Sequence, residues 1–410
     1  MRIAVISDWF SEKMGYAENF LPKAFAALGH ETHLITTNAQ VYFDTPFYQS
    51  TYEPFLGSSL VEPGTKELDG YTLHRLPFGR KNSWPWRHAL DIPGLDETLW
   101  HLKPDIVQTF DIACPSSFRA ARTAARLGFK LYLESHLHAS VMAQGHRAPG
   151  RSQSFRRFFN KKWLLGRFIS RRAIKCYPIS SDAADIALSD LGVEPSKIEI
   201  CSLGVDHLLF RPPTTEGDKA RRNELRRAWG IRDDEIVCIY TGRLTEDKGP
   251  LLLAEAVDQL VRKGKPFRAL FVGSGVPDVC NAIARCRGCL IQPFVPARDL
   301  PPFYWTADIG VWPRQESTSQ LDAMSCALPI IISNKATVRE RVEGNGLDYA
   351  EGDSSELAKK IESLASPDTR RQLGTVGRSK IVQCFSWELI AQKRLQDYSA
   401  PTSPPPLRQT

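Results

Sequence analysis

Two cations follow an apolar run in the stretch IVCIYTGRLTEDKGP. Arg243 and Lys248 lie between this predicted strand and a predicted helix, and Pro250 falls near the first helical turn. Two cations beside a helix N-terminus suit an anion such as a diphosphate. The alternative is that both are ordinary solvated loop charges.

Two carboxylates, Glu316 and Asp322, lie in the stretch VWPRQESTSQLDAMSCALPIIIS, where a strand ends and a helix is expected to begin. The hydroxyl residues between them are Ser317, Thr318 and Ser319. Open backbone N–H groups at residues 318–321 would receive a phosphate, Asp322 would bind both hydroxyls of a ribose, and Glu316 would bind sugar hydroxyls. Helix capping explains either carboxylate alone. The cations of one loop and the carboxylates of the other together favour a sugar nucleotide.

The composition is that of a soluble globular protein long enough for two domains, with 410 residues, 42% hydrophobic and 24% charged. No apolar run approaches the ~18 residues of a membrane span, and the N-terminus lacks the features of a signal peptide. The nine cysteines lie mostly in apolar contexts, which predicts reduced thiols in a cytosolic protein. Only Cys286 and Cys289 have metal-like spacing, and no second pair or histidine follows them, so no metal site is expected.

Strands and helices alternate along most of the chain. RIAVISD is a predicted buried strand, residues 16–28 form a predicted amphipathic helix ending at Gly29, and HETHLITT is the next strand. A second alternating series starts near residue 236, and the segment near 200–235 is the predicted join. This order predicts an α/β chain with two parallel sheets. Ligands bind at the carboxyl ends of such strands, so two facing domains would form a cleft between them.

The stretch FRRFFNKKWLLGRFISRR, residues 155–172, is basic, aromatic and roughly amphipathic at helical spacing. One interpretation is a surface that binds an anionic membrane. The other is an ordinary domain helix with a basic solvent face. Nucleic acid is not expected as a partner, because no known binding module accompanies the charge.

Five stretches, in this order, resemble the retaining glycosyltransferases of family 4, which have the GT-B fold. They are MGYAENFLPKAFAALGHETHLITT, ISSDAADIALSDLGVEPSKIEICSLGVDHLLFRP, GRLTEDKG, ESTSQLDAMSCALPIIIS and FSWELIAQKRLQDY. The resemblance implies two Rossmann-like domains facing across a cleft, residues 1–205 and residues 206–385. Residues at about 40–100 depart from the alternation of strands and helices, and they are predicted to form an irregular insertion with a hairpin near DGYTLHRLP. The resemblance also implies a helix at 386–398 that crosses back to the first domain, before a disordered tail at 399–410.

The resemblance further implies a role for each matched residue. Arg243 and Lys248 would neutralise the diphosphate, Glu316 would bind the donor sugar, and Asp322 the ribose. The remaining matched residues are Ser317, Thr318 and Ser319 near the phosphates, Gly273 and Phe294 near the base, Gly15 and Tyr16 in the phosphate and acceptor loop, and His136 near the reacting sugar, with His138 as its rival. The carboxylate loop departs from the family pattern: it is shorter, and its second carboxylate is aspartate rather than glutamate.

The expected function is therefore transfer of a sugar from a nucleoside-diphosphate sugar to a saccharide or lipid-linked saccharide, with retention at the anomeric carbon. No cofactor is expected, and no metal, because the two cations would carry the diphosphate charge and no Asp-x-Asp motif is present. The alternatives are a sugar-nucleotide epimerase on the same fold and a non-catalytic sugar-nucleotide-binding protein. The expected location is the cytoplasm, with peripheral attachment to the inner face of the membrane if residues 155–172 bind lipid.

Overall fold

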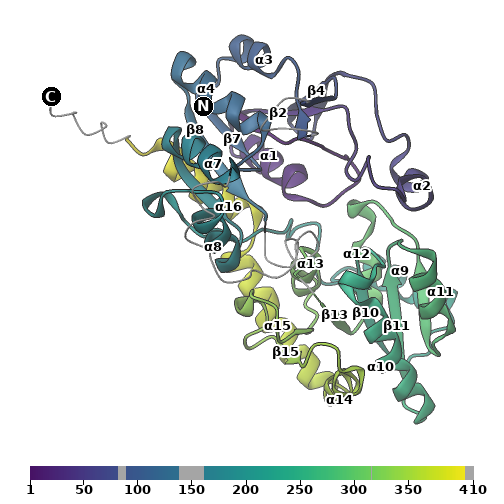
Figure 1. Cartoon of the computed structure of the whole chain (residues 1–410). Helices are drawn as coiled ribbons and strands as arrows, with labels where there is room; N and C mark the ends of the chain where they lie inside the picture. The colour runs from purple at the N-terminus through teal and green to yellow at the C-terminus, as the bar shows by residue number, and fades with distance from the viewer. Residues whose placement is uncertain (82–88, 138–160, 315, 402–410) are drawn as a thin grey trace.

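The computed structural model describes residues 1–81, 89–137, 161–314 and 316–401. Figure 1 shows two lobes, one formed by the first half of the chain and the other by most of the second half. The predicted site residue His138, residues 155–160 of the basic segment and the tail from residue 402 lie outside the described residues.

The first lobe is built on a seven-stranded sheet. Its strands are β1 (Arg2–Ile6), β2 (Glu31–Thr37), β3 (Gly64–Leu68), β4 (Tyr71–Leu76), β7 (Ile106–Thr109), β8 (Lys130–Ser135) and β9 (Ala173–Pro178). They lie in the order β3-β4-β2-β1-β7-β8-β9, and all neighbours are parallel except β3 and β4. The helices of this lobe are α1 (Ala17–Ala27), α2 (Glu53–Leu56), α3 (Leu95–Leu102), α4 (Pro115–Leu127), α7 (Lys161–Arg172) and α8 (Ser181–Ser189).

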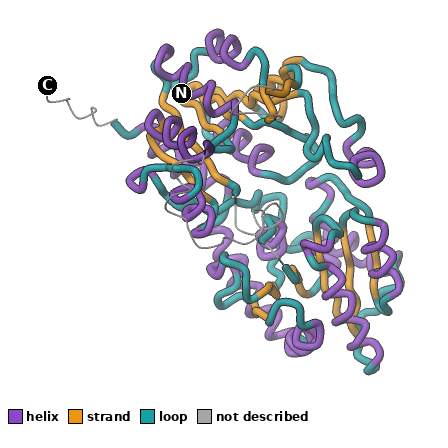
Figure 2. Tube along the Cα trace, in the orientation of Figure 1, coloured by secondary structure: helices purple, strands orange, loops and turns teal. Residues whose placement is uncertain are grey.

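The second lobe is built on a six-stranded, all-parallel sheet in the order β12-β11-β10-β13-β14-β15. Its strands are β10 (Ile236–Thr241), β11 (Phe267–Val272), β12 (Cys289–Gln292), β13 (Ile309–Trp312), β14 (Ile330–Ser333) and β15 (Gly346–Tyr349). Its helices are α9 (Glu216–Ala228), α10 (Pro250–Arg262), α11 (Pro277–Arg285), α12 (Pro301–Thr306), α13 (Ser319–Ser325), α14 (Ser354–Ser363) and α15 (Pro367–Cys384). Figure 2 shows strands of this sheet with helices outside them.

The strand sequences explain why the central strands are buried on both faces. The residues of β10, IVCIYT, are all buried, without the alternation of a half-exposed strand. The same holds for Ile3 to Ile6 of β1. The predicted α/β class with two Rossmann-like sheets is confirmed, and the predicted first helix is present as α1, followed by Gly29 in the left-handed region at φ 84°.

The region at 40–100 is more regular than the sequence indicates. The hairpin β3–β4 is present, and β4 pairs in parallel with β2, so it extends the main sheet. A short antiparallel pair, β5 (Gly79–Lys81) and β6 (Ala89–Asp91), follows. Residues 41–57 leave the sheet and carry a cluster of aromatic side chains toward the second lobe.

The last described helix, α16 (Trp387–Ser399), lies with the first lobe (Figure 1). It packs along α1, and Asp397 accepts hydrogen bonds from Lys175 and Tyr177 of β9. The chain therefore joins the lobes twice, once before α9 and once before α16. The exact domain limits remain a prediction.

The described helices and cysteines bear on the expectations drawn from the composition. None of their helices combines the length and apolar character needed to cross a membrane. All nine cysteines are free thiols, and five of them are buried. Cys176, Cys201, Cys238 and Cys326 lie in the hydrophobic cores, where they act as packing groups.

We predict that Gly204→Ala destabilises the junction between the lobes. A Cβ at Gly204 would lie 2.8 Å from the indole of Trp387 and 2.9 Å from Cδ1 of Ile390. Overpacking of this kind costs about 1–3 kcal/mol, which thermal unfolding would show as a lower melting temperature. The control is Gly217→Ala in α9, where the added Cβ meets only the Thr215 hydroxyl, at 3.8 Å. Helix propensity favours that substitution. Equal melting temperatures for the two variants would contradict the prediction.

Candidate functional site

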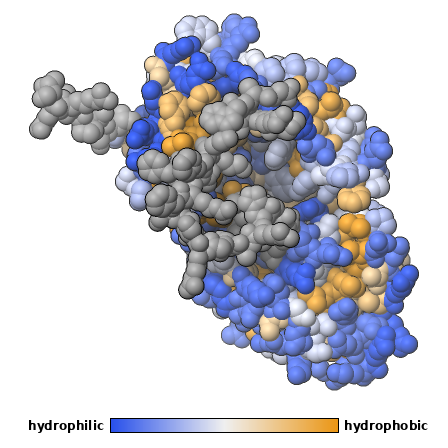
Figure 3. All heavy atoms as spheres, in the orientation of Figure 1, coloured by the Kyte–Doolittle hydropathy of each residue, from blue (hydrophilic) through white to orange (hydrophobic). Residues whose placement is uncertain are grey.

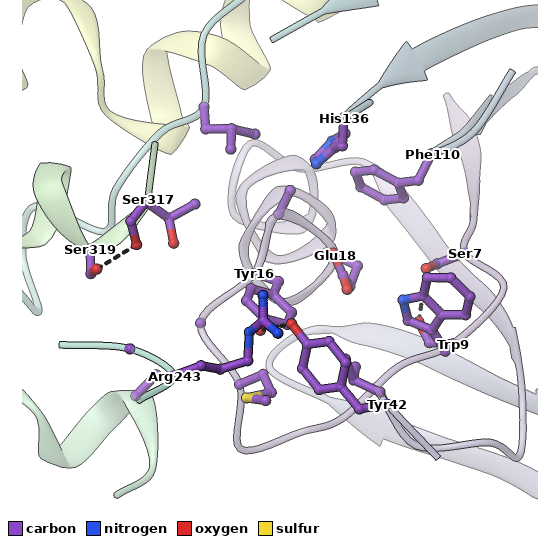
Figure 4. Close-up of a pocket in the computed structure, with 18 of the residues that line it drawn as sticks. Ser7, Trp9, Tyr16, Glu18, Tyr42, Phe110, His136, Arg243, Ser317 and Ser319 are labelled. Carbon is purple, nitrogen blue, oxygen red and sulfur yellow. Dashed lines mark hydrogen bonds between the residues drawn. The ribbon is translucent and has the colours of Figure 1, made fainter. Parts of the chain in front are cut away.

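A cavity of about 760 Å³ lies where the two lobes meet, and residues of both lobes line it. On the face shown in Figure 3 the surface is hollowed between the lobes. The cavity is large enough for a nucleotide-sized ligand. Of the residues singled out from the sequence, it brings together Gly15, Tyr16, His136, Arg243, Lys248, Phe294, Glu316, Ser317, Thr318, Ser319 and Asp322. Figure 4 shows that His136, Tyr16 and Tyr42 approach it from the first lobe, and Arg243, Ser317 and Ser319 from the second.

Gly273 does not line the cavity, although its neighbour Val272 does. A Cβ at Gly273 would lie 1.8 Å from the Gly242 carbonyl oxygen. Glycine is therefore needed there for packing of two adjacent loops, which is a structural reason independent of any base. His138 cannot be placed, because it lies outside the described residues.

Arg243 and Lys248 follow the carboxyl end of β10, where the sequence placed them. A short 3-10 turn, Glu246–Lys248, and Gly249 at φ 66° lead into α10, which begins at Pro250. The Lys248 ammonium donates to the carbonyl oxygen of Glu316 at 3.3 Å. Burial and the nearby Arg243 charge lower the pKa of Lys248 to about 8. The loop therefore holds two cations close enough to repel each other.

Arg243 contacts the first lobe directly. Its guanidinium lies 5.4 Å from the centroid of the Tyr42 ring, and the Tyr42 hydroxyl is 2.9 Å from that of Tyr16 (Figure 4). Nη2 of Arg243 also lies 3.6 Å from Asp247 Oδ2. These contacts orient the guanidinium, so the phosphate-binding loop and the first loop meet in the cavity.

The hydroxyl residues before α13 form a short hydrogen-bond chain. Ser319 Oγ donates to the Thr241 carbonyl oxygen at 3.0 Å and accepts from the Trp312 indole at 3.0 Å. The Ser317 and Ser319 hydroxyls are 2.7 Å apart (Figure 4). These bonds tie the loop to the ends of β10 and β13.

The expectation of open N–H groups at residues 318–321 is wrong for two of them. The Gln320 and Leu321 N–H groups donate to the carbonyl oxygens of Ser317 and Thr318, at 3.2 and 2.9 Å. These bonds form the start of α13, so the two groups are not available to a phosphate without a local rearrangement.

Glu316 does not cap α13. Its Oε1 accepts from the backbone N–H of Thr337 at 2.8 Å and from the Thr337 hydroxyl at 3.1 Å. Thr318, the residue at the N-cap position, makes no side-chain capping bond. The capping interpretation thus does not explain Glu316, whose carboxylate instead joins two loops at the cavity.

Asp322 lies in the first turn of α13 and lines the cavity. Burial raises the pKa of Asp322 to about 8. The Tyr304 hydroxyl is 3.5 Å from its Oδ2, at the long limit of a hydrogen bond. A ligand that donates hydrogen bonds to this carboxyl group would stabilise its ionised form.

His136 follows β8 and lines the first-lobe side of the cavity. Its Nε2 is 2.9 Å from Oε1 of Glu134, and Phe110 packs edge-on at 5.4 Å between ring centroids. Burial alone would lower the pKa of His136, but the hydrogen bond to Glu134 and the charges of Glu134 and Glu18 raise it. Burial also raises the pKa of Glu18 to about 7. This side of the cavity therefore holds a histidine and a carboxyl group whose pKa values are both raised.

Sequence reasoning missed other lining residues. Tyr42 lines the cavity and lies in the 40–100 region, where no motif or spacing indicated a functional site. Its neighbours Tyr52 and Phe55 pack on the Phe294 ring, at 6.0 and 5.6 Å between centroids. The first lobe thus reaches across to the loop predicted to lie near the base.

Arg341, Asp8 and Glu18 are among the charged lining residues that the sequence reasoning missed. Arg341 is buried and donates from Nη1 to the Ser317 carbonyl oxygen at 3.1 Å, so it supports the hydroxyl loop. No spacing or motif around Arg341 marks it. Asp8 directly follows β1, so the rule that sites lie at strand carboxyl ends would have found it.

Comparison with known proteins supplies the family. The family model for the glycosyl transferase 4-like domain matches residues 21–204, and that for glycosyl transferases group 1 matches residues 235–366. Together they cover most of the chain and one model falls on each lobe.

Individual curated proteins match about half of the chain. Spore coat protein SA of Bacillus subtilis is 28% identical over 223 residues, 50% of this chain and 59% of that protein. A D-inositol 3-phosphate glycosyltransferase of Rhodococcus erythropolis is 29% identical over 231 residues, 52% of this chain and 50% of that protein. The chain spans about half the length of the curated relatives it matches.

Solved structures match over almost the whole chain. A glycosyltransferase of Rickettsia africae has a TM-score of 0.69 at 16% identity, covering 97% of both chains. Anabaena HepE in complex with UDP-glucose has a TM-score of 0.68 at 17% identity, covering 97% of this chain and 99% of that chain. At such identities the similarity to solved structures establishes the fold, which is the GT-B architecture of two Rossmann-like domains. The two family models establish the family: the chain belongs to the group 1 glycosyl transferases.

Proposed function

We propose that this chain is a retaining glycosyltransferase that moves a sugar from a nucleoside-diphosphate sugar to a saccharide or lipid-linked saccharide without a metal ion. The observation that carries the proposal is the meeting of Arg243, Lys248, Glu316 and Asp322 around one cavity between the two sheets. The names of its relatives support it: one is a D-inositol 3-phosphate glycosyltransferase, and the Anabaena neighbour was solved with UDP-glucose.

Charge development accounts for the two cations. Breaking a glycosyl–phosphate bond leaves positive charge on the sugar and negative charge on the departing diphosphate. Arg243 and Lys248 would stabilise that diphosphate most as its charge grows, which is the condition for accelerating the reaction. Partial burial strengthens the effect, because the surrounding dielectric is lower than that of water.

Retention follows if the acceptor attacks the face that the diphosphate leaves. The bond from the anomeric carbon to the phosphate oxygen breaks, and a bond from that carbon to the acceptor oxygen forms. The acceptor proton passes to the departing diphosphate, so no separate base is required. His136 would then position or polarise the reacting sugar, Glu316 would bind its hydroxyls, and Asp322 would accept from the ribose.

The basic helix supports a lipid-linked acceptor. In α7 the buried Ile169 faces the domain, while Leu164 and Phe168 are exposed by 54% and 39%. Arg171 and Arg172 are also exposed at the end of the helix. An exposed face with both apolar and basic residues suits the surface of an anionic membrane. The other interpretation is that α7 is an ordinary domain helix with a basic solvent face, and the burial of Ile169 agrees with it.

We predict that the chain releases nucleoside diphosphate from one of a panel of UDP-, GDP- and ADP-sugars in the presence of EDTA. A membrane lipid extract should stimulate release, because it supplies the acceptor. Lys248→Ala should lower the rate about 100-fold or more, since it removes a charge that stabilises the leaving group. The measurement is nucleotide release coupled to detection of the transferred sugar.

The matched control is Lys263→Ala, at the exposed far end of the same helix that Lys248 precedes. It should leave the rate unchanged. Binding of a donor without any release would favour the non-catalytic alternative. Conversion of the donor sugar without an acceptor would favour the epimerase.

We predict that Lys248→Arg changes the pH dependence of nucleotide binding. Lys248 has a pKa lowered to about 8, so it loses its charge above that pH, whereas arginine stays charged. The diphosphate is fully ionised over this range, since its last pKa is about 6. The ratio of the variant's affinity for UDP, GDP or ADP to that of the wild type should therefore rise about tenfold per pH unit above pH 8.

Calorimetric titrations from pH 7 to 9.5 would measure this ratio. Asp322, whose pKa is raised to about 8, also affects nucleotide affinity over this range. Because it is present in both proteins, its effect cancels in the ratio of their affinities. A ratio that stays constant over this range would show that Lys248 does not carry the charge that the diphosphate binds.

We predict that the protein binds vesicles containing anionic lipid, and that Arg171→Glu/Arg172→Glu weakens this binding. Each basic residue near such a surface contributes roughly 1 kcal/mol, so the double reversal should lower vesicle affinity at least about tenfold. Co-sedimentation with phosphatidylglycerol vesicles would measure it. The control, Arg221→Glu/Arg227→Glu on the exposed face of α9, makes the same change in net charge. Equal losses in both variants would contradict a specific membrane surface on α7.

A further inference from the structure

His136 is held by a carboxylate that is completely buried. Glu134, near the end of β8, has no exposed surface, and its Oε1 is the partner of His136 Nε2. Its other oxygen, Oε2, accepts from Gln108 Nε2 at 2.7 Å and from Arg394 Nη1 at 3.0 Å. A buried carboxylate stays ionised only when such donors replace its lost hydration. The donors of Glu134 therefore determine how it binds His136.

Arg394 comes from α16, 260 positions further along the chain than Glu134. Its side chain is 1% exposed, and its guanidinium lies 4.0 Å from the centroid of the Tyr177 ring. Tyr398 of the same helix donates to Gln108, which is the second donor to Glu134 Oε2. The C-terminal helix thus supplies one donor to the carboxylate and orients the other.

Arg394 itself does not line the cavity, whereas His136 does. The charged groups acting on His136 are Glu134 from β8, Glu18 from α1 and Arg394 from α16. The two carboxylates raise the pKa of His136 and the Arg394 charge opposes them. Figure 4 shows His136 and Glu18 on the same side of the pocket, with Phe110 beside the histidine.

We propose that Arg394 is a positioning residue, which acts on the reacting sugar through Glu134 and His136. With Oε2 occupied by Arg394 and Gln108, Glu134 presents Oε1 to His136 and fixes Nε2 as the protonated ring nitrogen. The neutral ring then has Nδ1 as its acceptor, and the protonated ring has it as a donor. This inference rests on the proposed function for the role of His136. It also makes the docking of α16 a condition for a competent site.

The kinetic test compares Arg394→Met and Arg394→Lys, each alone and combined with His136→Ala. Met keeps the approximate length without the charge, and Lys keeps the charge. Arg394→Met should lower kcat for nucleotide release about tenfold or more with little change in donor KM, and Arg394→Lys should restore part of the loss. In the His136→Ala background Arg394→Met should change kcat less than about twofold, because both act on one interaction.

Losses that multiply in the double variant would overturn the proposal, since a merely structural role weakens the enzyme whether or not His136 is present. Each variant is compared at equal folded fraction, determined by thermal unfolding.

A second test needs no activity. Imidazole NMR titration of the full, substrate-free chain, with His136 assigned by its loss in His136→Ala, gives the midpoint of its protonation. Arg394→Met should shift this midpoint, because it removes both a nearby positive charge and a donor that keeps Glu134 ionised, and Arg394→Lys should leave it near the wild-type value. An unchanged midpoint in Arg394→Met overturns the proposal.

If Arg394→Met does not fold, Glu134→Gln tests the same path. It keeps an acceptor oxygen and should lower the His136 midpoint, and no change there also overturns the proposal. Absence of nucleotide release by the wild type from every donor would instead count against the proposed function, and the titration would still decide the role of Arg394.

Discussion

The repulsion between Arg243 and Lys248 is the constraint on which the rest of the site depends. Two cations share one partly buried loop, and the depressed pKa of Lys248 reflects that cost. The surrounding structure keeps them in place: the Glu316 carbonyl oxygen accepts from Lys248, and the Tyr42 ring faces Arg243. A bound anion would reduce the repulsion between the two cations, and both cations would attract it. The loop is therefore prepared for a dianionic ligand, and its preparation requires residues from both lobes.

Local pattern was enough to predict the parts of the site that lie close together in sequence. Arg243 and Lys248 share one loop after a buried strand, and Glu316 and Asp322 flank another, so strand order alone brings them together. Partners from elsewhere in the chain were beyond such reasoning: Tyr42 reaches Arg243 from the other lobe. Fine hydrogen bonding was also beyond it. The N–H groups of Gln320 and Leu321 form hydrogen bonds at the start of α13, and Glu316 binds Thr337 rather than capping the helix.

The fold shows the same division between local and long-range information. Alternating apolar strands and amphipathic helices predicted two parallel sheets, and the family resemblance predicted their GT-B arrangement. A hairpin was predicted near DGYTLHRLP, but the parallel pairing of β4 with β2 was not, because strand neighbours depend on the tertiary structure. His136 was found through resemblance rather than through its own environment. Its support, from Glu134 and Arg394, joins the two ends of the chain and leaves no local pattern.

The described charges around the cavity are arranged to match the proposed chemistry. On the first lobe they are mostly carboxylates, including Asp8 and Glu18, and on the second lobe the cations Arg243, Lys248 and Arg341 outnumber the carboxylates. Burial raises the pKa of both Asp8 and Glu18 to about 7, so each is partly neutral near pH 7. Positive charge developing on a sugar between the lobes would favour their ionised forms. A glycosyl–phosphate bond that breaks there would separate its charges along the existing field, with the diphosphate toward the second lobe and the sugar toward the first.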